Sequence, residues 1–191
     1  MVNNLVKILV VSFQLFIGMF LITGQIYAQA PPPSPTLVAQ TEAMKKIEKM
    51  VGNWEGQGWY EMVPGRRSNF KSTEIIEKRL NGLVILVEGV HKAQIPNKSE
   101  DVVIHHALAV ITYDTESKSY SFRPHLANGN SSNAEATINQ DGAFVWGFKL
   151  PNGQRYRYTI TIDKDQWTEI GELSMDENKW QKFFEMNLKK Q

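Results

Sequence analysis

Arginine, histidine and glutamate side chains in the second half of the chain are the groups whose chemistry could hold a small molecule. Arginine forms paired hydrogen bonds with carboxylates, so a few arginines in an otherwise apolar cavity could orient an acidic ligand. Tryptophan rings could line the same cavity. The predicted ligand-binding residues are Arg123, His125, Arg155, Arg157, Trp59, Trp146 and Glu169.

Each of these residues also has an ordinary structural interpretation. Arg155 and Arg157 alternate with Tyr156 and Tyr158, and such alternation is typical of a strand with one solvent-facing side. We favour this solvent-facing interpretation for the arginines. Four tryptophans, Trp59, Trp146, Trp167 and Trp180, either line a cavity or fill it, and we favour core packing for them.

The histidines do not form a recognised metal motif. His105 and His106 are adjacent on a predicted strand, so their rings point to opposite faces. His105 could instead meet His91 or His125 across strands and form a metal site, but no ligand spacing supports one. We therefore predict no metal site.

Catalytic motifs are also missing from the sequence. It contains no Gly-x-Ser-x-Gly elbow, no His-Glu-x-x-His helix and no glycine-rich phosphate loop. The enzymatic alternative is acid–base chemistry by Glu169 or Glu74, with a pKa raised by an apolar cavity and His125 as the partner.

The elements that must position these residues are strands. From Glu55 onward apolar residues recur at every second position, and Asn-Gly, Asp-Gly and similar turn signals separate the runs at intervals of about ten residues. About ten strands follow: 55–62, 68–80, 82–91, 103–113, 118–125, 133–139, 143–150, 154–163, 166–174 and 179–189. Because consecutive hairpins dominate, we predict an all-β fold, an antiparallel up-and-down β-barrel, over the rival β-sandwich.

Two features are predicted to close one end of this barrel. A barrel-end motif, Gly52, Trp54, Gly56 and Gly58, lets the first strand run close to its neighbours while the indole ring plugs the barrel. Residues 37–51 carry apolar side chains at near-helical spacing, with Thr41 and Glu42 near the start. We predict a short amphipathic capping helix there.

The N-terminal residues are typical of a secretory signal. Lys7 precedes an apolar run over residues 8–23, which is short for a permanent membrane anchor. Cleavage after Ala30 would place Pro31 directly behind the cut bond, so we favour cleavage after Ala28. The predicted organisation is a signal peptide over residues 1–28, a proline-rich tether over 29–36 and the barrel domain over 37–191.

Composition narrows the function classes. The chain has 21 Lys+Arg against 20 Asp+Glu, and a balanced charge without a basic block argues against nucleic-acid binding. The absence of cysteine excludes thiolate catalysis, Cys-type zinc sites and lipid attachment at a cysteine. We expect an exported protein, periplasmic or extracellular, held together by its core alone and not inserted in the membrane after signal removal.

The glycine-tryptophan entry at Gly52–Gly58 resembles that of the calycins, which include lipocalins, fatty-acid-binding proteins and nitrobindin-like haem barrels. The later residues Trp167, Glu169, Gly171, Trp180 and Phe184 are similar to the uncharacterised bacterial proteins of the DUF1579 type. This resemblance, which covers about residues 48–188, implies a barrel and does not by itself imply a function.

The resemblance also has departures. Nitrobindin-like barrels hold haem through a histidine late in the chain, whereas no histidine here follows His125, so we predict no cofactor. Fatty-acid-binding barrels hold a carboxylate with an Arg-x-Tyr pair near the C-terminus. The nearest analogue is the Arg155–Tyr158 segment, a partial match.

We therefore expect an exported, non-catalytic barrel that binds a small hydrophobic or amphiphilic molecule. The alternatives are a structural or interaction module whose barrel is filled by its own side chains, and an isomerase or hydrolase that uses the cavity. The interior distinguishes them, because a binder needs an open cavity of mixed polarity.

Overall fold

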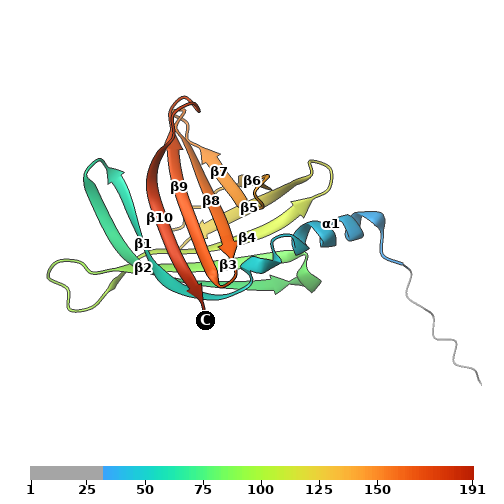
Figure 1. The fold of residues 1–191 in the computed structure, drawn as a ribbon, viewed down its shortest axis with the longest axis horizontal. Coiled ribbons are helices and arrows are strands. Elements are labelled where there is room, and N and C mark those ends of the chain that lie inside the picture. Colours follow the sequence, from blue (N-terminus) through green and yellow to red (C-terminus); the bar gives the residue numbers. More distant parts are fainter. Residues whose placement is uncertain (1–31) are drawn as a thin grey trace, which may run out of the picture. The chain divides into compact units, whose positions relative to one another are not determined.

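The computed structural model describes residues 32–191, which form one helix, two short 3-10 turns and ten strands (Figure 1). The helix α1 spans Pro35–Lys45, and the 3-10 turns span Glu48–Met50 and Leu80–Gly82. The strands are β1 (Gly52–Val63), β2 (Arg66–Arg79), β3 (Val84–Ala93), β4 (Val102–Asp114), β5 (Ser119–Leu126), β6 (Ala134–Ile138), β7 (Phe144–Lys149), β8 (Arg155–Asp163), β9 (Gln166–Ser174) and β10 (Gln181–Lys190).

The strands close into a barrel in which every strand pairs antiparallel with its neighbours in the sequence. The circle is completed where β1 pairs with β10, with Trp54 opposite Lys190 and Tyr60 opposite Phe184. The predicted up-and-down barrel of ten strands is therefore confirmed, and the sandwich is excluded. The strands form where they were predicted because the side chains of each alternate between the interior and solvent.

The capping helix begins earlier than predicted. The Ser34 hydroxyl accepts a hydrogen bond from the Leu37 amide at 3.2 Å, and Pro35 occupies the first helical turn. Serine at the cap and proline directly after it are a favourable helix start, because that turn leaves amides unpaired and the proline ring already has a helical φ. The helix thus includes two residues of the predicted tether, and the chain continues past Lys45 as a 3-10 turn.

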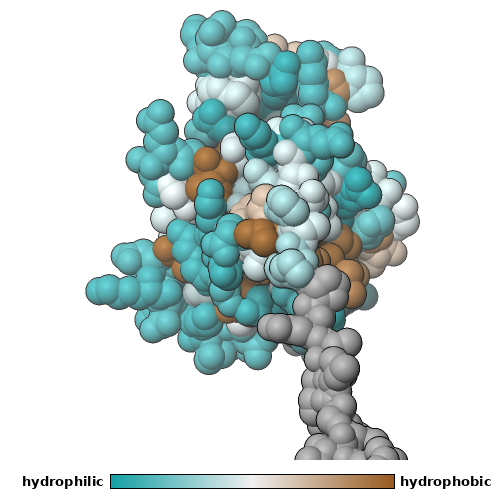
Figure 2. Space-filling view, turned by 90° about the vertical axis from the view of Figure 1, so that its right-hand side faces the viewer, coloured by the Kyte–Doolittle hydropathy of each residue, from teal (hydrophilic) through white to brown (hydrophobic). Residues whose placement is uncertain are grey.

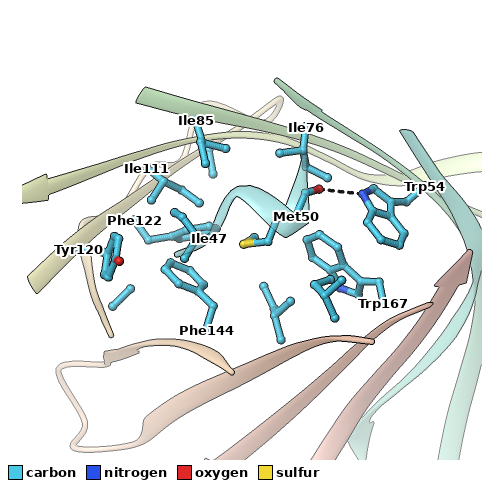
Figure 3. Packing of buried hydrophobic residues seen from close by; sticks show 14 of the residues in the cluster. Ile47, Met50, Trp54, Ile76, Ile85, Ile111, Tyr120, Phe122, Phe144 and Trp167 are labelled. Carbon is cyan, nitrogen blue, oxygen red and sulfur yellow. Dashed lines mark hydrogen bonds between the residues drawn. The ribbon is translucent and has the colours of Figure 1, made fainter. Parts of the chain in front are cut away.

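The segment that follows α1 enters the end of the barrel and forms the centre of the core (Figure 3). Ile47 and Met50 are buried between aliphatic side chains of β2–β4 and the aromatic rings of Phe144 and Trp167. The Tyr120 hydroxyl donates to the Ala43 carbonyl at 2.6 Å. Burial of the phenol raises the pKa of Tyr120 to about 12, so it remains a donor at neutral pH. This hydrogen bond ties the end of α1 to β5.

Trp54 occupies the same end of the barrel. Its ring is 1% exposed, its Nε1 donates to the Met50 carbonyl at 2.8 Å, and it packs edge-on against Trp167 with ring centroids 5.6 Å apart. The nearby Gly56 lies so close to β10 that a Cβ there would be 2.1 Å from the Asn187 carbonyl oxygen. The motif therefore combines a buried ring with a close approach of two backbones.

The surface of the barrel is largely hydrophilic on the face seen in Figure 2, with separate apolar areas between polar side chains. Within residues 32–191, no helix is both long enough and apolar enough to cross a bilayer. The predicted signal peptide lies outside the described residues, as do residues 29–31 of the predicted tether.

Candidate functional site: an acidic, aromatic cavity inside the barrel

A cavity of about 550 Å³ occupies the barrel interior next to the buried core. Side chains from nine of the strands, together with Met50 and Ser132, line it. Most are apolar or aromatic, and none of the described lysine and arginine residues is among them. The polar groups that face the cavity are those of Glu74, His91, His105, Ser132, Tyr158 and Glu169, with the indole nitrogens of Trp146 and Trp167.

Glu74 is placed in the cavity by the alternation of β2. Phe70, Ser72, Glu74 and Ile76 are the buried positions of this strand, so one carboxyl group replaces what would otherwise be an apolar side chain. Burial raises the pKa of Glu74 to about 7, and a hydrogen bond from the Ser72 hydroxyl at 3.3 Å partly offsets that rise. This carboxyl therefore titrates near neutrality.

Two histidines lie beside Glu74. His91 of β3 and His105 of β4 are cross-strand partners with ring centroids 4.8 Å apart, so His105 meets His91, one of the two alternatives that the sequence left open. His91 Nε2 is 3.4 Å from Glu74 Oε1, a long contact. Burial lowers the pKa of His91 to about 4, and burial together with repulsion from His91 and His106 lowers that of His105 to about 4. Both rings are therefore neutral at pH 7, and the Glu74 contact is not an ion pair.

Glu169 is the second buried carboxyl group. It faces inward from β9 between Trp167 and Gly171 and has no hydrogen-bond or ion-pair partner within residues 32–191. Burial, together with repulsion from Glu74, raises the pKa of Glu169 to about 8. The indole N–H groups of Trp146 and Trp167 partly oppose it, although neither reaches hydrogen-bonding geometry and both are otherwise unpaired.

Aromatic rings form most of the cavity wall. The rings of Phe122, Trp146 and Tyr158 are stacked, with Trp146 centroid distances of 4.3 Å to Phe122 and 4.2 Å to Tyr158. Phe70 stacks on His91 at 4.4 Å and on Phe184 at 5.6 Å. These stacks provide flat, apolar surfaces in the same cavity as the acidic groups, which is an arrangement suited to an aromatic or aliphatic molecule.

The structure brings only two of the predicted ligand-binding residues, Trp146 and Glu169, into the cavity. Arg123 and His125 are exposed on β5, whereas the alternate residues Phe122 and Pro124 line the cavity. Arg123 Nε contacts the Ser121 hydroxyl and the Asn133 side chain. Because His125 is on the outside, it is not the partner of either buried glutamate.

The other predicted ligand-binding residues also lie on the outer surface. Arg155 forms an ion pair with Glu177 at 2.7 Å, and Arg157 pairs with Glu172 at 2.8 Å. Trp59 is covered by the Arg67 guanidinium, 3.6 Å from the ring centroid. The tyrosines that alternate with the two arginines face inward instead. The two arginines therefore face the solvent, which is the interpretation favoured from the sequence.

Sequence reasoning missed Gly89, which makes room for the Glu74 carboxyl group. The two residues are cross-strand partners, and a Cβ on Gly89 would lie 2.6 Å from Glu74 Oε2. The signal was a glycine at an inward position of a strand, which often marks a close approach of another group. The sequence did not show that the approaching group is the Glu74 carboxyl, because this depends on the register of β2 against β3.

The positions of the histidines bear on metal and haem ligation. Among residues 32–191, no three His, Cys, Asp or Glu side chains are arranged to hold a metal ion. His125, the last histidine of the chain, lies outside the cavity, and the cavity histidines come from β3 and β4. The histidines therefore do not fit the haem arrangement that the sequence resemblance implies.

The fold is a closed antiparallel barrel of ten strands, and the solved structures that are similar to it include two of low sequence identity. One is Rv2717c from M. tuberculosis, with a TM-score of 0.55 and 11% identity over 78% of this chain and 97% of that one. The other is the S-type phycobiliprotein lyase CPES from Guillardia theta, with a TM-score of 0.54 and 12% identity over 83% and 98%. No protein-family model matches the chain, nor does any curated protein sequence. At these identities the likeness concerns the fold alone.

Proposed function

We propose that the protein is a non-catalytic binder that holds a small, largely apolar molecule inside its barrel. The observation that carries this proposal is the cavity of about 550 Å³, which lies within the range of about 300–1,000 Å³ common for small-molecule sites. Its aromatic walls and few polar groups fit such a site. An open interior also favours a binder over a barrel filled by its own side chains.

The similarity to a phycobiliprotein lyase adds limited support. That protein's name refers to a bilin-carrying partner, so a barrel of this shape is compatible with handling a small pigment molecule. One fold hosts many activities, and for this reason the likeness does not select the ligand. The ligand class has to come from the side chains of this cavity.

The proposal is tested with N-phenyl-1-naphthylamine, an uncharged dye whose fluorescence rises in apolar surroundings. We expect saturable binding of about one dye per chain. Ala107→Trp places an indole in the cavity from β4 and should abolish the rise. Leu108→Trp is the matched control, since Leu108 is 40% exposed on the same strand and should leave binding unchanged. No dye binding, or equal binding by both variants, would refute a cavity binder.

A second candidate function is proton transfer on a bound ligand. Glu74 and Glu169 titrate near neutrality, as general acids and bases do, and His91 lies beside Glu74. Once native mass spectrometry has identified a retained ligand, its incubation with the protein in deuterated water tests this function. Deuterium uptake at carbon that is lost in Glu74→Gln would support catalysis, whereas an unchanged ligand supports binding alone.

We also infer export and a DUF1579-type relationship from the sequence alone. The apolar segment after Lys7 and the small residues before Gln29 support secretion, and the residues around Trp167 and Phe184 support the relationship. Intact mass of the exported protein tests processing. A mature chain that begins at Gln29, cyclised or not, is the expected result, and one that begins at Pro31 or retains Met1 would contradict it.

A further inference from the structure

We propose that the cavity selects a molecule that carries a positively charged amine on an apolar body. This inference rests on the proposed binding function and names the chemical class of its ligand. The geometry that points to it is two inward-facing carboxyl groups in an aromatic cavity whose wall contains no lysine or arginine. The cavity thus contains acidic groups without cationic partners.

The surroundings of Glu74 leave its charge uncompensated. Ser72 of the same strand donates one hydrogen bond, Gly89 of β3 contributes no side chain, and the His91 ring is neutral. From the other strands, His105 is also neutral and Glu169 repels rather than attracts. An ionised Glu74 would therefore have hydrogen-bond support and no opposite charge.

Within the described part of the chain, Glu169 lacks a positively charged partner even more clearly than Glu74 does. This side chain is 8% exposed and has no polar partner among the described residues. Trp146 and Trp167 bring two unpaired indole N–H groups close to it, Tyr158 faces it from β8, and Glu74 repels it when ionised. The indole groups can stabilise a carboxylate by hydrogen bonding, but a counter-charge has to come from the ligand.

An ammonium group would supply that charge with favourable surroundings. It can donate hydrogen bonds to a carboxylate, and the faces of tryptophan and tyrosine rings attract cations. Tyr158 lines the cavity with the acid, whereas the faces of Trp146 are covered by the stacked rings of Phe122 and Tyr158. The apolar remainder of the molecule would lie against the aromatic wall around Phe70 and Phe184.

A carboxylate ligand would meet the opposite conditions. No cation of the cavity wall could pair with it, and the two glutamates would repel it. The arginines expected to hold such a ligand are engaged with Glu177 and Glu172 on the outer surface. The Arg155–Tyr158 segment, a partial match to a carboxylate-holding pair, therefore supplies no cation to the cavity.

The test compares three ten-carbon molecules that differ in the polar end: decylamine, decan-1-ol and decanoate. Displacement of N-phenyl-1-naphthylamine gives each affinity at about pH 8.5, where Glu169 ionises. We expect decylamine to bind about tenfold or more tightly than decan-1-ol, and decanoate to bind most weakly. Glu169→Gln should reduce the preference for the amine over decan-1-ol, because one of the two cavity carboxyl groups is lost.

The control is Glu172→Gln, which removes a carboxyl group on the same strand but outside the barrel. It should bind the three molecules as the natural protein does. Calorimetry at about pH 7 in phosphate and in Tris provides a measurement that needs no variant, because binding of an amine should release a proton from the cavity carboxyls and binding of the alcohol should not. This second measurement decides the matter if Glu169→Gln fails to fold.

The outcomes separate the two proposals. If none of the molecules displaces the dye and the dye itself does not bind, the binding function is wrong. If the dye and decan-1-ol bind but decylamine shows no preference and releases no proton, the cavity is a binding site and the amine proposal is wrong. Tighter binding of decanoate than of decylamine would overturn it as well.

Discussion

The Glu74 carboxyl group occupies the space that a side chain on Gly89 would fill. A Cβ built on Gly89 lies 2.6 Å from one carboxyl oxygen and 2.7 Å from the other, although the two residues belong to different strands. A buried acid thus has a dedicated place in the wall of the cavity, and that place depends on a hydrogen atom at the facing position.

Gly89→Ala should therefore displace the Glu74 carboxyl and destabilise the barrel by about 1–3 kcal/mol, the usual range for overpacking. Urea unfolding measures the loss. The double variant Gly89→Ala with Glu74→Ala should be less destabilised than the sum of the two single variants, because removal of the carboxyl removes the clash. Additive losses would mean that the two side chains do not compete for the same space.

Glu169 should make the protein less stable as the pH rises. Its pKa is about 8 in the folded protein and about 4.5 when unfolded, so the folded state retains a proton that the unfolded state has lost. The contribution of Glu169 to the unfolding free energy is fully present below its pKa in the unfolded chain. That contribution is lost as the pH rises through its pKa in the folded protein. The buried histidines act in the opposite direction only below about pH 6.5, their unperturbed pKa.

Between about pH 6.5 and 8.5 the natural protein should thus lose on the order of 1–3 kcal/mol of unfolding free energy. Glu169→Gln should show a smaller loss, and Glu172→Gln should keep the full one. Urea denaturation at the two pH values measures both. If Glu169→Gln and the natural protein lose the same unfolding free energy between the two pH values, Glu169 is ionised in the folded protein throughout this range.

Trp54 should be one of the most costly side chains to truncate. Trp54→Ala removes a ring that is 1% exposed and leaves a void beside Met50 and Trp167, so we expect a loss of about 3–5 kcal/mol in urea unfolding. Trp59→Ala is the control, since that ring lies on the outer surface under Arg67 and should cost about 1 kcal/mol. Similar losses for the two variants would contradict the role of Trp54 in closing the barrel end.

Arg157 should have no effect on ligand binding. An inward-facing Arg157 could have held an acidic ligand, but the structure places this guanidinium against Glu172 and the Trp180 ring outside the barrel. We expect unchanged dye and decylamine affinities and a stability loss of about 1 kcal/mol or less, as for other surface pairs. A tenfold weaker affinity for either molecule would place Arg157 in the binding site.

The sequence predicted the barrel because every strand carries its own evidence. Alternation over Tyr156–Ile162 and turn signals such as Asp141-Gly142 are local, and ten such segments in succession leave few other arrangements. The start of α1 was missed for a local reason as well. The proline-rich run was interpreted as a tether, although Ser34 followed by Pro35 is a favourable helix start.

The site was less predictable because it depends on pairing between strands. Alternation indicated that Arg157 and Tyr158 face opposite sides, and the inward position of Glu74 follows from the same rule. What could not be derived is which residues meet. The contact between His91 and His105 and the fit of Glu74 against Gly89 follow from register, and a bulge beside His91 shifts that register.

Closure of the barrel through β1 and β10 has a consequence for folding. Because Trp54 pairs with Lys190, the first strand finds its second neighbour only when the last strand is available. Contacts between such distant segments form slowly, and meanwhile β1 presents an unpaired edge. An incomplete chain that lacks β10 keeps the edges of β1 and β9 open at once, and we expect such chains to associate with one another through these two strands.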